Sequence, residues 1–214
     1  MKSNKKPNLH RDTESATSFF GKWAESGKDA GMEEHHSESV NFMIDKISKN
    51  SNSGFNFIDA GCGNGWVVRK MKEHSSCEYS SGVDGAMQMI DKARNIDPEG
   101  DYFYSDLLEW KPNKKYDFVH SMEVFYYFRD VSKILGKIHK EWLCENGKLI
   151  FGIDHYSENK TSLNWPEKCG VFMNTLSIKE WKKLLSDTGF RNINYWQVGQ
   201  KNDWLGTLVF YAEK

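Results

Sequence analysis

The chain has 214 residues, of which 38% are hydrophobic and 14% aromatic, so it is long enough to form one domain around a single large core. Its formal net charge of -1 argues against a nucleic-acid partner, which usually needs a basic face, and we expect Lys2 to Arg11 to be a flexible, solvated tail. No apolar run is long enough to cross a membrane, no apolar signal core follows the N-terminus, and no Cys-x-x-Cys pair occurs. We therefore expect a cytoplasmic protein with no membrane partner and with reduced thiols at Cys62, Cys77, Cys144 and Cys169.

The N-terminal segment, from about residue 12 to residue 37, does not fit the repeating pattern that follows it. It contains the aromatic residues Phe19, Phe20 and Trp23, and its glycines offer hinges within a polar sequence. We expect residues 1–37 to form a tail and a lid over a bound ligand, ordered mainly when that ligand is present, and residues 38–214 to form the main domain. Phe19 and Phe20 are expected to pack this leader onto the domain, whereas Trp23 could also contact the ligand.

Two adjacent histidines, His35 and His36, lie near the end of the leader. Adjacent residues of a helix point in different directions, and Glu33 and Glu34 suit the first turn of a helix, so we expect no metal site here. His36 is a candidate catalytic base or ligand contact, and a solvated or capping histidine is the alternative.

An amphipathic helix and then a buried strand are predicted next. Apolar residues recur at helical spacing over residues 40–47, and an apolar run at residues 55–58 leads into the turn Asp59-Ala60-Gly61-Cys62-Gly63-Asn64-Gly65. A strand that turns abruptly into a helix has this pattern. The glycines permit positive φ and close approach of a ligand, and the helix predicted over residues 66–73 directs its free N–H groups towards that ligand.

The spacing of the glycines argues against two common phosphate-binding motifs. In the Gly-x-Gly-x-x-Gly fingerprint of dinucleotide-binding proteins, the third glycine allows close helix–strand packing, and here that position is Trp66. No Gly-Lys-Ser/Thr sequence is present either, which excludes a P-loop.

Three further strand-like segments each end in polar residues. Residues 79–84 end at Asp84, which is 19 residues after Gly65, where a doubly wound sheet places a carboxylate that binds the two hydroxyls of a ribose. Residues 101–105 lead into Asp106, and residues 116–120 lead into Ser121-Met122-Glu123. Each acid alone could be a solvated turn residue.

Together, these motifs over residues 40–154 resemble those of the class I S-adenosylmethionine (SAM)-dependent methyltransferases, and the segment Ser121-Met122-Glu123-Val124 resembles the branch that modifies small molecules such as ubiquinone and menaquinone precursors. The resemblance implies SAM as the cofactor. It also implies that Asp59 organises the glycine loop and the ammonium group of the cofactor, that Asp84 binds the ribose, and that Asp106 binds the adenine amino group.

The predicted cofactor contacts extend along all these segments, and Met87 is expected on the adenine face. They are Trp23, Asp59, Ala60, Gly61, Cys62, Gly63, Gly65, Asp84, Gly85, Met87, Asp106, Leu107 and Ser121.

The rest of the chain continues the alternation of helices and strands. We predict a helix over residues 131–142 that Asn146-Gly147 ends, a fifth strand over residues 148–154, and a helix capped by Ser177 and closed by Thr188-Gly189. Two late strands follow at about residues 192–198 and 205–212. The predicted fold is therefore α/β and Rossmann-like: a doubly wound, mostly parallel, seven-stranded sheet with an antiparallel C-terminal hairpin.

An insertion at residues 155–174 interrupts this pattern after the fifth strand, and we expect it to act as a second lid. Candidate catalytic or acceptor-binding residues at this end of the sheet are Glu123, Tyr127, His155 and His36. We expect His155→Ala and Tyr127→Phe to alter methyl transfer while SAM affinity and melting temperature stay unchanged.

The predicted function is SAM-dependent methyl transfer to a small-molecule acceptor through an oxygen, nitrogen or carbon nucleophile. The chain lacks the Asp/Asn-Pro-Pro-Tyr/Phe signature of amino-group nucleic-acid methyltransferases. A methyltransferase acting on RNA or protein, and a catalytically silent SAM-binding subunit, are the alternatives. The sequence leaves the oligomeric state open.

Overall fold

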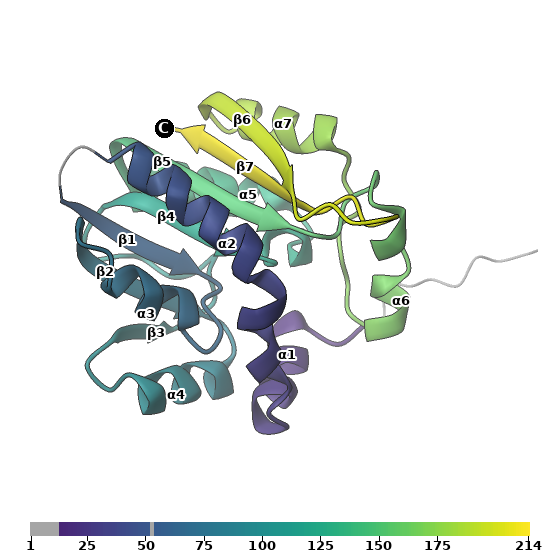
Figure 1. The fold of residues 1–214 in the computed structure, drawn as a ribbon, viewed down its shortest axis with the longest axis horizontal. Coiled ribbons are helices and arrows are strands. Elements are labelled where there is room, and N and C mark those ends of the chain that lie inside the picture. The colour runs from purple at the N-terminus through teal and green to yellow at the C-terminus, as the bar shows by residue number, and fades with distance from the viewer. Residues whose placement is uncertain (1–12, 52–53) are drawn as a thin grey trace, which may run out of the picture.

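The computed structural model describes residues 13–51 and 54–214, which form a seven-stranded sheet with helices on both faces (Figure 1). The sheet order is β3-β2-β1-β4-β5-β7-β6; β1 to β5 run parallel, and β7 pairs antiparallel with β5 and β6. The strands are β1 (Phe55–Ala60), β2 (Cys77–Asp84), β3 (Asp101–Tyr104), β4 (Tyr116–Met122), β5 (Leu143–Ile153), β6 (Arg191–Val198) and β7 (Thr207–Glu213). The predicted Rossmann-like fold with its antiparallel hairpin is confirmed. The predicted tail at Lys2 to Arg11 lies outside the described residues.

Helices cover both faces of the sheet, which explains why its central strands are almost continuously apolar. The helices are α1 (Ala16–Glu25), η1 (Lys28–Gly31), α2 (Met32–Lys49), α3 (Trp66–Lys72), α4 (Met87–Ile96), η2 (Phe125–Tyr127), α5 (Val131–Lys137), η3 (Ile138–Trp142), η4 (Lys160–Ser162), α6 (Trp165–Cys169) and α7 (Ile178–Asp187). Residues of α2 and α3, such as Met43, pack with Phe57 on one face. Residues of α5 and α7, such as Ile134 and Trp181, pack with Phe151 on the other.

The ends of α7 are those that the sequence predicts. The Ser177 side chain accepts a hydrogen bond from the Glu180 backbone N–H at 3.3 Å, and the Glu180 side chain accepts one from the Ser177 backbone N–H at 2.7 Å. This capping box satisfies N–H groups at the start of the helix. At the other end, Thr188 is the C-cap and Gly189 has a φ of 101°, a value that favours glycine.

The prediction for residues 131–147 is wrong in one respect. The α-helix ends at Lys137, a π-helical turn continues to Trp142, and β5 already begins at Leu143. Asn146, with a φ of 63°, and Gly147 therefore lie inside β5, where its pairing with β4 shifts register. An Asn-Gly pair tolerates left-handed backbone in a bulge as well as at a helix end, so its composition alone could not locate the boundary.

The leader and the insertion meet beyond the carboxyl ends of the parallel strands (Figure 1). The Glu14 N–H donates to the Gly170 carbonyl at 3.0 Å, and Glu14 also forms an isolated parallel bridge with Val171. Helix α1 packs against α4, where a side chain at Gly21 would meet Gln88. Both irregular segments thus lie at the end of the sheet where doubly wound folds bind ligands.

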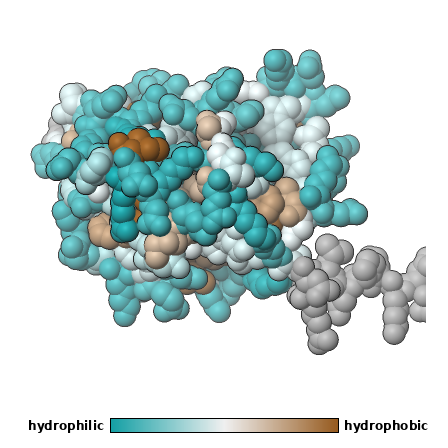
Figure 2. Space-filling model, turned by 90° about the horizontal axis from the view of Figure 1, so that it is seen from below, coloured by the Kyte–Doolittle hydropathy of each residue, from teal (hydrophilic) through white to brown (hydrophobic). Residues whose placement is uncertain are grey.

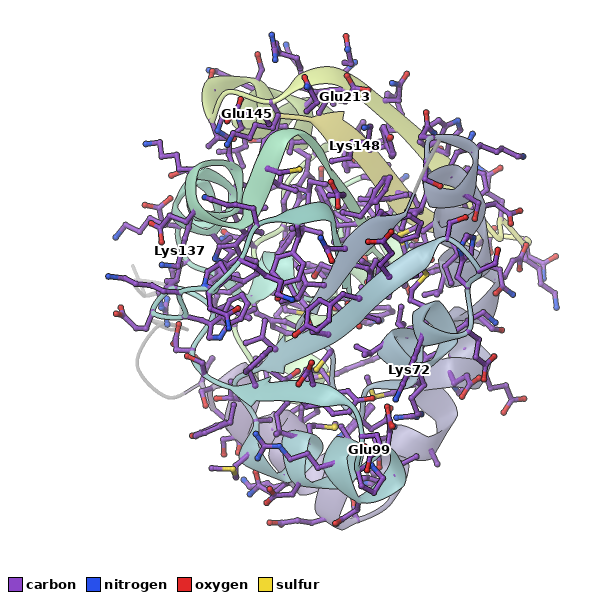
Figure 3. The ribbon with its side chains drawn as sticks, turned by 90° about the vertical axis from the view of Figure 1, so that its left-hand side faces the viewer. Lys72, Glu99, Lys137, Glu145, Lys148 and Glu213 are labelled. Carbon is purple, nitrogen blue, oxygen red and sulfur yellow. The ribbon has the colours of Figure 1, made fainter. Side chains whose placement is uncertain are left out.

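The surface seen from below in Figure 2 is mainly hydrophilic, with small, separated apolar areas. Charged side chains of both signs lie at the surface, among them Lys72, Glu99 and Glu145 (Figure 3). Within residues 13–51 and 54–214, no helix has the length and apolarity that a membrane span requires.

Candidate active site

A cavity of about 860 Å³ lies at the carboxyl ends of the parallel strands. Its walls come from the glycine loop after β1, from residues at or just after the ends of β2 to β5, and from α1, α2 and the insertion. Most of its exposed lining is apolar, and the polar groups lie at a few positions. A largely apolar cavity with a few polar groups is typical of a small-molecule site.

The glycine loop forms one wall of this cavity. Gly61 and Gly63 line it, with φ values of 77° and 52°. A side chain at Gly61 would collide with Val124 at 2.3 Å, whereas the position at Gly63 faces more open space. Gly65 also has positive φ (77°), but it packs against the ring of Tyr102 and does not line the cavity.

Asp84, the last residue of β2, lies in the cavity wall beside the glycine loop. Its Oδ2 accepts a hydrogen bond from the Gly63 N–H at 2.9 Å, and its Oδ1 accepts one from the Ala86 N–H at 2.7 Å. Burial raises the pKa of this carboxyl to about 6. The side chain therefore shapes the loop and presents a partly solvent-shielded acceptor to the cavity.

The residues after the third strand that were predicted to contact adenine also line the cavity. Asp106 and Leu107 line it, and Asp106 Oδ1 accepts a hydrogen bond from the Leu108 N–H at 2.7 Å. Met89 lines the cavity in place of Met87, whose side chain is 41% exposed. The difference arises because α4 begins at Met87 and turns its buried face, which includes Met89, towards the sheet.

Asp59 was expected to contact the cofactor, but it does not line the cavity. It is buried, and its Oδ1 lies 2.7 Å from Nδ1 of the equally buried His120 on the neighbouring strand β4. Its side chain thus ties β1 to β4 directly before the glycine loop.

Five other predicted cofactor contacts lie outside the lining as well. Ser121, for example, donates from its hydroxyl to the Ala60 carbonyl at 2.7 Å, which holds β4 to β1. The remaining predicted contacts Trp23 and Gly85 do line the cavity. The five outside it are Ala60, Cys62, Gly65, Met87 and Ser121.

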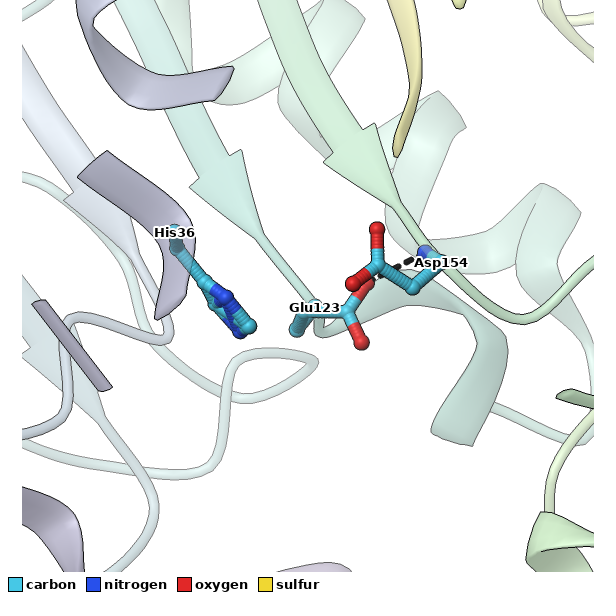
Figure 4. A group of neighbouring side chains, drawn as sticks. All are labelled: His36, Glu123 and Asp154. Carbon is cyan, nitrogen blue, oxygen red and sulfur yellow. Dashed lines mark hydrogen bonds between the residues drawn. The ribbon is translucent and has the colours of Figure 1, made fainter. Parts of the chain in front are cut away.

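In another part of the cavity wall, side chains from three elements meet (Figure 4). His36 comes from α2, Glu123 follows β4, and Asp154 follows β5. Glu123 Oε1 accepts a hydrogen bond from the Asp154 N–H at 2.5 Å, and its Oε2 accepts one from the Tyr126 hydroxyl at 2.7 Å.

The charges in this group have no cationic partner among the described residues. Burial, and then the nearby Asp154 carboxyl, raises the pKa of Glu123 well above its usual range, and burial raises the pKa of Asp154 to about 6. Burial lowers the pKa of His36 to about 4, so its ring is neutral at pH 7.

Tyr127 and the aromatic residues of α1 form a further part of the cavity wall. Phe19, Phe20, Trp23 and Tyr127 all line the cavity, and the rings of Phe20 and Tyr127 lie edge to face with centroids 5.6 Å apart. The hydroxyl oxygens of Tyr127 and Tyr126 lie 3.3 Å apart. Phe19 and Phe20 were expected only to pack the leader onto the domain, yet they also face the cavity.

His155 was expected at the acceptor edge, but its ring is buried behind it. One ring nitrogen lies 3.0 Å from the Ser162 carbonyl, and the other lies 2.8 Å from the Thr175 hydroxyl. The residue is fully buried and absent from the cavity lining. Both ring nitrogens thus have partners at the two ends of the insertion, and a role as an acceptor contact stays a prediction.

The leader is anchored by a residue that sequence reasoning missed. Asp29 is fully buried; its carboxyl lies 2.6 Å from Nζ of Lys92 on α4 and accepts a hydrogen bond from Asn64 of the glycine loop at 2.8 Å. This contact joins the leader to the loop and to α4.

The family described as a methyltransferase domain matches residues 31–195. A malonyl-[acyl-carrier protein] O-methyltransferase from Acetivibrio thermocellus is 28% identical over 52% of this chain and 40% of that protein. A trans-aconitate 2-methyltransferase from Agrobacterium fabrum is 28% identical over 64% of this chain and 50% of that protein. The chain thus spans about half or less of the length of these two relatives.

Solved structures share the fold. One belongs to a complex between the Haloferax volcanii Trm112 methyltransferase activator and a methyltransferase; it matches with a TM-score of 0.79 and 23% identity, over 91% of this chain and 96% of that chain. Another is the N-methyltransferase NodS from Bradyrhizobium japonicum in complex with S-adenosylhomocysteine (SAH), with a TM-score of 0.65 and 17% identity over 83% of this chain and 86% of that chain.

Proposed function

This chain belongs to the class I SAM-dependent methyltransferases, and on that premise we propose that it methylates a small molecule bound between Glu123, His36 and Tyr127. The observation that carries the proposal is the cavity, whose wall contains the glycine loop, Asp84 and this polar group. The acceptor atom is an oxygen, nitrogen or carbon nucleophile.

The residues present fit SAM. Gly61 and Gly63 leave the main chain of the loop bare where the cofactor would lie against it, and Asp84 offers carboxylate oxygens for a ribose. Asp106 and Leu107 line the cavity, and we propose that they contact the adenine. When bound, SAM supplies a methyl group activated by a positively charged sulfur.

The position of the leader, residues 13–37, favours a small acceptor and a role of the leader as a lid. Residues of α1 and η1 cover the cavity, and Asp29 anchors them to Asn64 and Lys92. We propose that residues 13–37 and 155–174 close over the bound molecules and exclude water, which leaves alignment of the reacting groups to supply much of the rate. A macromolecular substrate would have to insert a single group beneath this cover.

Of the relatives named above, one acts on a free small acid and the other on an acyl group carried by a protein. Their names give malonyl-[acyl-carrier protein] and trans-aconitate as the substrates of those proteins. The acceptor of this chain is a separate question, because the sequence identity is 28% in each case.

The experiment that tests the proposal is incubation of the purified protein with SAM carrying an isotopically labelled methyl group and a metabolite extract. We expect mass spectrometry to detect label in a low-molecular-weight product. Label in RNA or protein instead would support the macromolecular alternative. SAM binding without any labelled product would support the silent subunit. Either result would contradict the proposed function.

A further inference from the structure

The group formed by His36, Glu123 and Asp154 has the composition of a metal site. Each residue offers one ligand atom, and these atoms all lie within 4.8 Å of one another. Figure 4 shows that they approach from α2 and from the ends of β4 and β5, which are far apart in the sequence. The fold itself therefore brings an imidazole and two carboxyls together.

Glu123 is held in place independently of any ligand. Its backbone has a φ of 61°, in the left-handed region, and its N–H donates to the Gly152 carbonyl at 2.9 Å. Both carboxylate oxygens accept hydrogen bonds, one from the Asp154 N–H and one from the Tyr126 hydroxyl. Such partners fix the orientation of a metal ligand and leave further lone pairs on each oxygen. A non-glycine residue in left-handed backbone is also typical of functional sites.

The other two side chains have buried atoms without partners. Asp154 is 8% exposed, and its Oδ1 has no hydrogen-bond partner among the described residues. Nδ1 of His36 is likewise buried without a partner in this part of the chain. Buried polar groups are almost always satisfied, so these two atoms are available to a partner that enters the cavity.

That ligand should carry positive charge. The Glu123 and Asp154 carboxyls lie side by side, Glu123 partly buried and Asp154 buried, and no lysine or arginine in the described ranges forms an ion pair with either. Uncompensated charge in a shielded cavity is costly unless it is paired or coordinates a metal.

We propose that His36, Glu123 and Asp154 bind a divalent transition-metal ion. One imidazole and two carboxylates suit ions such as Mn²⁺, Co²⁺ and Zn²⁺ better than Mg²⁺, which prefers oxygen ligands. Three protein ligands leave coordination positions open towards the cavity, as in catalytic metal sites, where an oxygen or nitrogen of the acceptor can bind. The site rests on these contacts alone and does not depend on the proposed acceptor.

From the sequence we expected no metal site at His35-His36, because adjacent residues of a helix point in different directions. In the structure the two rings indeed have different surroundings. The His35 ring nitrogen Nδ1 lies 2.6 Å from the Gly31 carbonyl of its own helix, whereas His36 faces Glu123 and Asp154. This difference provides a matched control, since His35 is adjacent in sequence and outside the ligand set.

The test is titration of the purified chain, without SAM, with Mn²⁺ alone, followed by electron paramagnetic resonance of the free ion. We expect about one bound ion per chain, and Zn²⁺ should displace it. His36→Ala, Glu123→Gln and Asp154→Asn should each weaken binding at least about tenfold, whereas His35→Ala and the exposed Glu34→Gln should not change it. Mn²⁺ should also raise the melting temperature of the parent chain more than that of Glu123→Gln.

Melting curves recorded without metal show whether each variant folds, and any two folded variants of the three are sufficient for the decision. Absence of Mn²⁺ binding, or binding that none of the three substitutions weakens, would overturn the proposal. Such a result would leave the proposed methyl transfer intact, because label transfer from SAM is measured separately.

Discussion

Replacing Asp84 should separate cofactor binding from stability. Its carboxylate is the group proposed to hold the ribose, and it accepts hydrogen bonds from the Gly63 and Ala86 N–H groups. Hydrogen bonds to a charged group contribute about 1.5–3 kcal/mol, so Asp84→Ala should weaken SAM binding roughly ten- to hundredfold. Asp84→Asn keeps one acceptor oxygen and should lie between this variant and the parent chain.

The folding stability of Asp84→Asn should change less than its affinity for SAM. Burial raises the pKa of Asp84 from its usual 3.8 to about 6, so its ionisation costs the ligand-free folded state up to roughly 3 kcal/mol at neutral pH. Because the carboxyl faces a cavity that water can enter, we expect about 1 kcal/mol of this cost to be recovered in Asp84→Asn. The carboxamide also loses one of the two hydrogen bonds from backbone N–H groups, which costs about 1 kcal/mol, so the melting temperature of that variant should stay close to that of the parent.

The raised pKa of Asp84 also determines how folding stability and SAM binding change with pH. A raised carboxyl pKa means that the folded protein takes up the proton more readily than the unfolded chain, so the Asp84 contribution to stability falls as pH rises from about 4 to about 6. SAM binding needs the ionised form and should weaken as pH falls below about 6.

Isothermal titration calorimetry and thermal melting measure both quantities. Asp45→Ala, on the exposed face of α2, is the control and should change neither. If Asp84→Ala binds SAM as tightly as the parent, the ribose role is wrong. If the difference in stability between the parent and Asp84→Asn is the same at pH 4 and at pH 7, the burial argument is wrong.

Three further substitutions test other parts of the site. Lys92→Ala removes the cation paired with buried Asp29 and should lower the free energy of unfolding by about 1–2 kcal/mol, since Lys92 is partly exposed. Hydrogen exchange should become faster in residues 13–31. Equal protection in the variant and the parent would contradict the role of Asp29 as an anchor of the leader. His155→Ala should lower the stability in urea unfolding by about 2–3 kcal/mol, because two hydrogen bonds and a buried ring are lost; an unchanged midpoint with altered turnover would restore the sequence expectation of an acceptor contact. Asp106→Ala should weaken SAM binding less than about tenfold in calorimetry, as its carboxyl is exposed and already accepts a bond from Leu108; a larger loss than in Asp84→Ala would refute this ranking.

The sequence located the cavity because parallel strands place their carboxyl ends at one edge of a sheet. Asp84, Asp106 and Glu123 each follow or end an apolar run, and all three line the cavity. Asp154 follows the fifth apolar run in the same way, so the rule that identified the others would also have identified it.

The direction of individual side chains was not predictable in the same way. Asp59 points to His120 because β1 and β4 are neighbours, a fact of strand order that no local pattern contains. The two hydrogen bonds of His155 depend on how the insertion folds. Asp29 lies in a polar stretch that reads as a solvated loop, and its burial follows from the packing of the leader against α4.

Calorimetry of the unmodified protein with SAM, SAH and NAD tests the central claim most directly. A cavity that combines the bare glycine loop with Asp84 predicts one binding event per chain for both SAM and SAH, with micromolar or tighter affinity, and none for NAD. No heat with either sulfur ligand, together with tight binding of NAD, would contradict the assignment of this cavity to SAM.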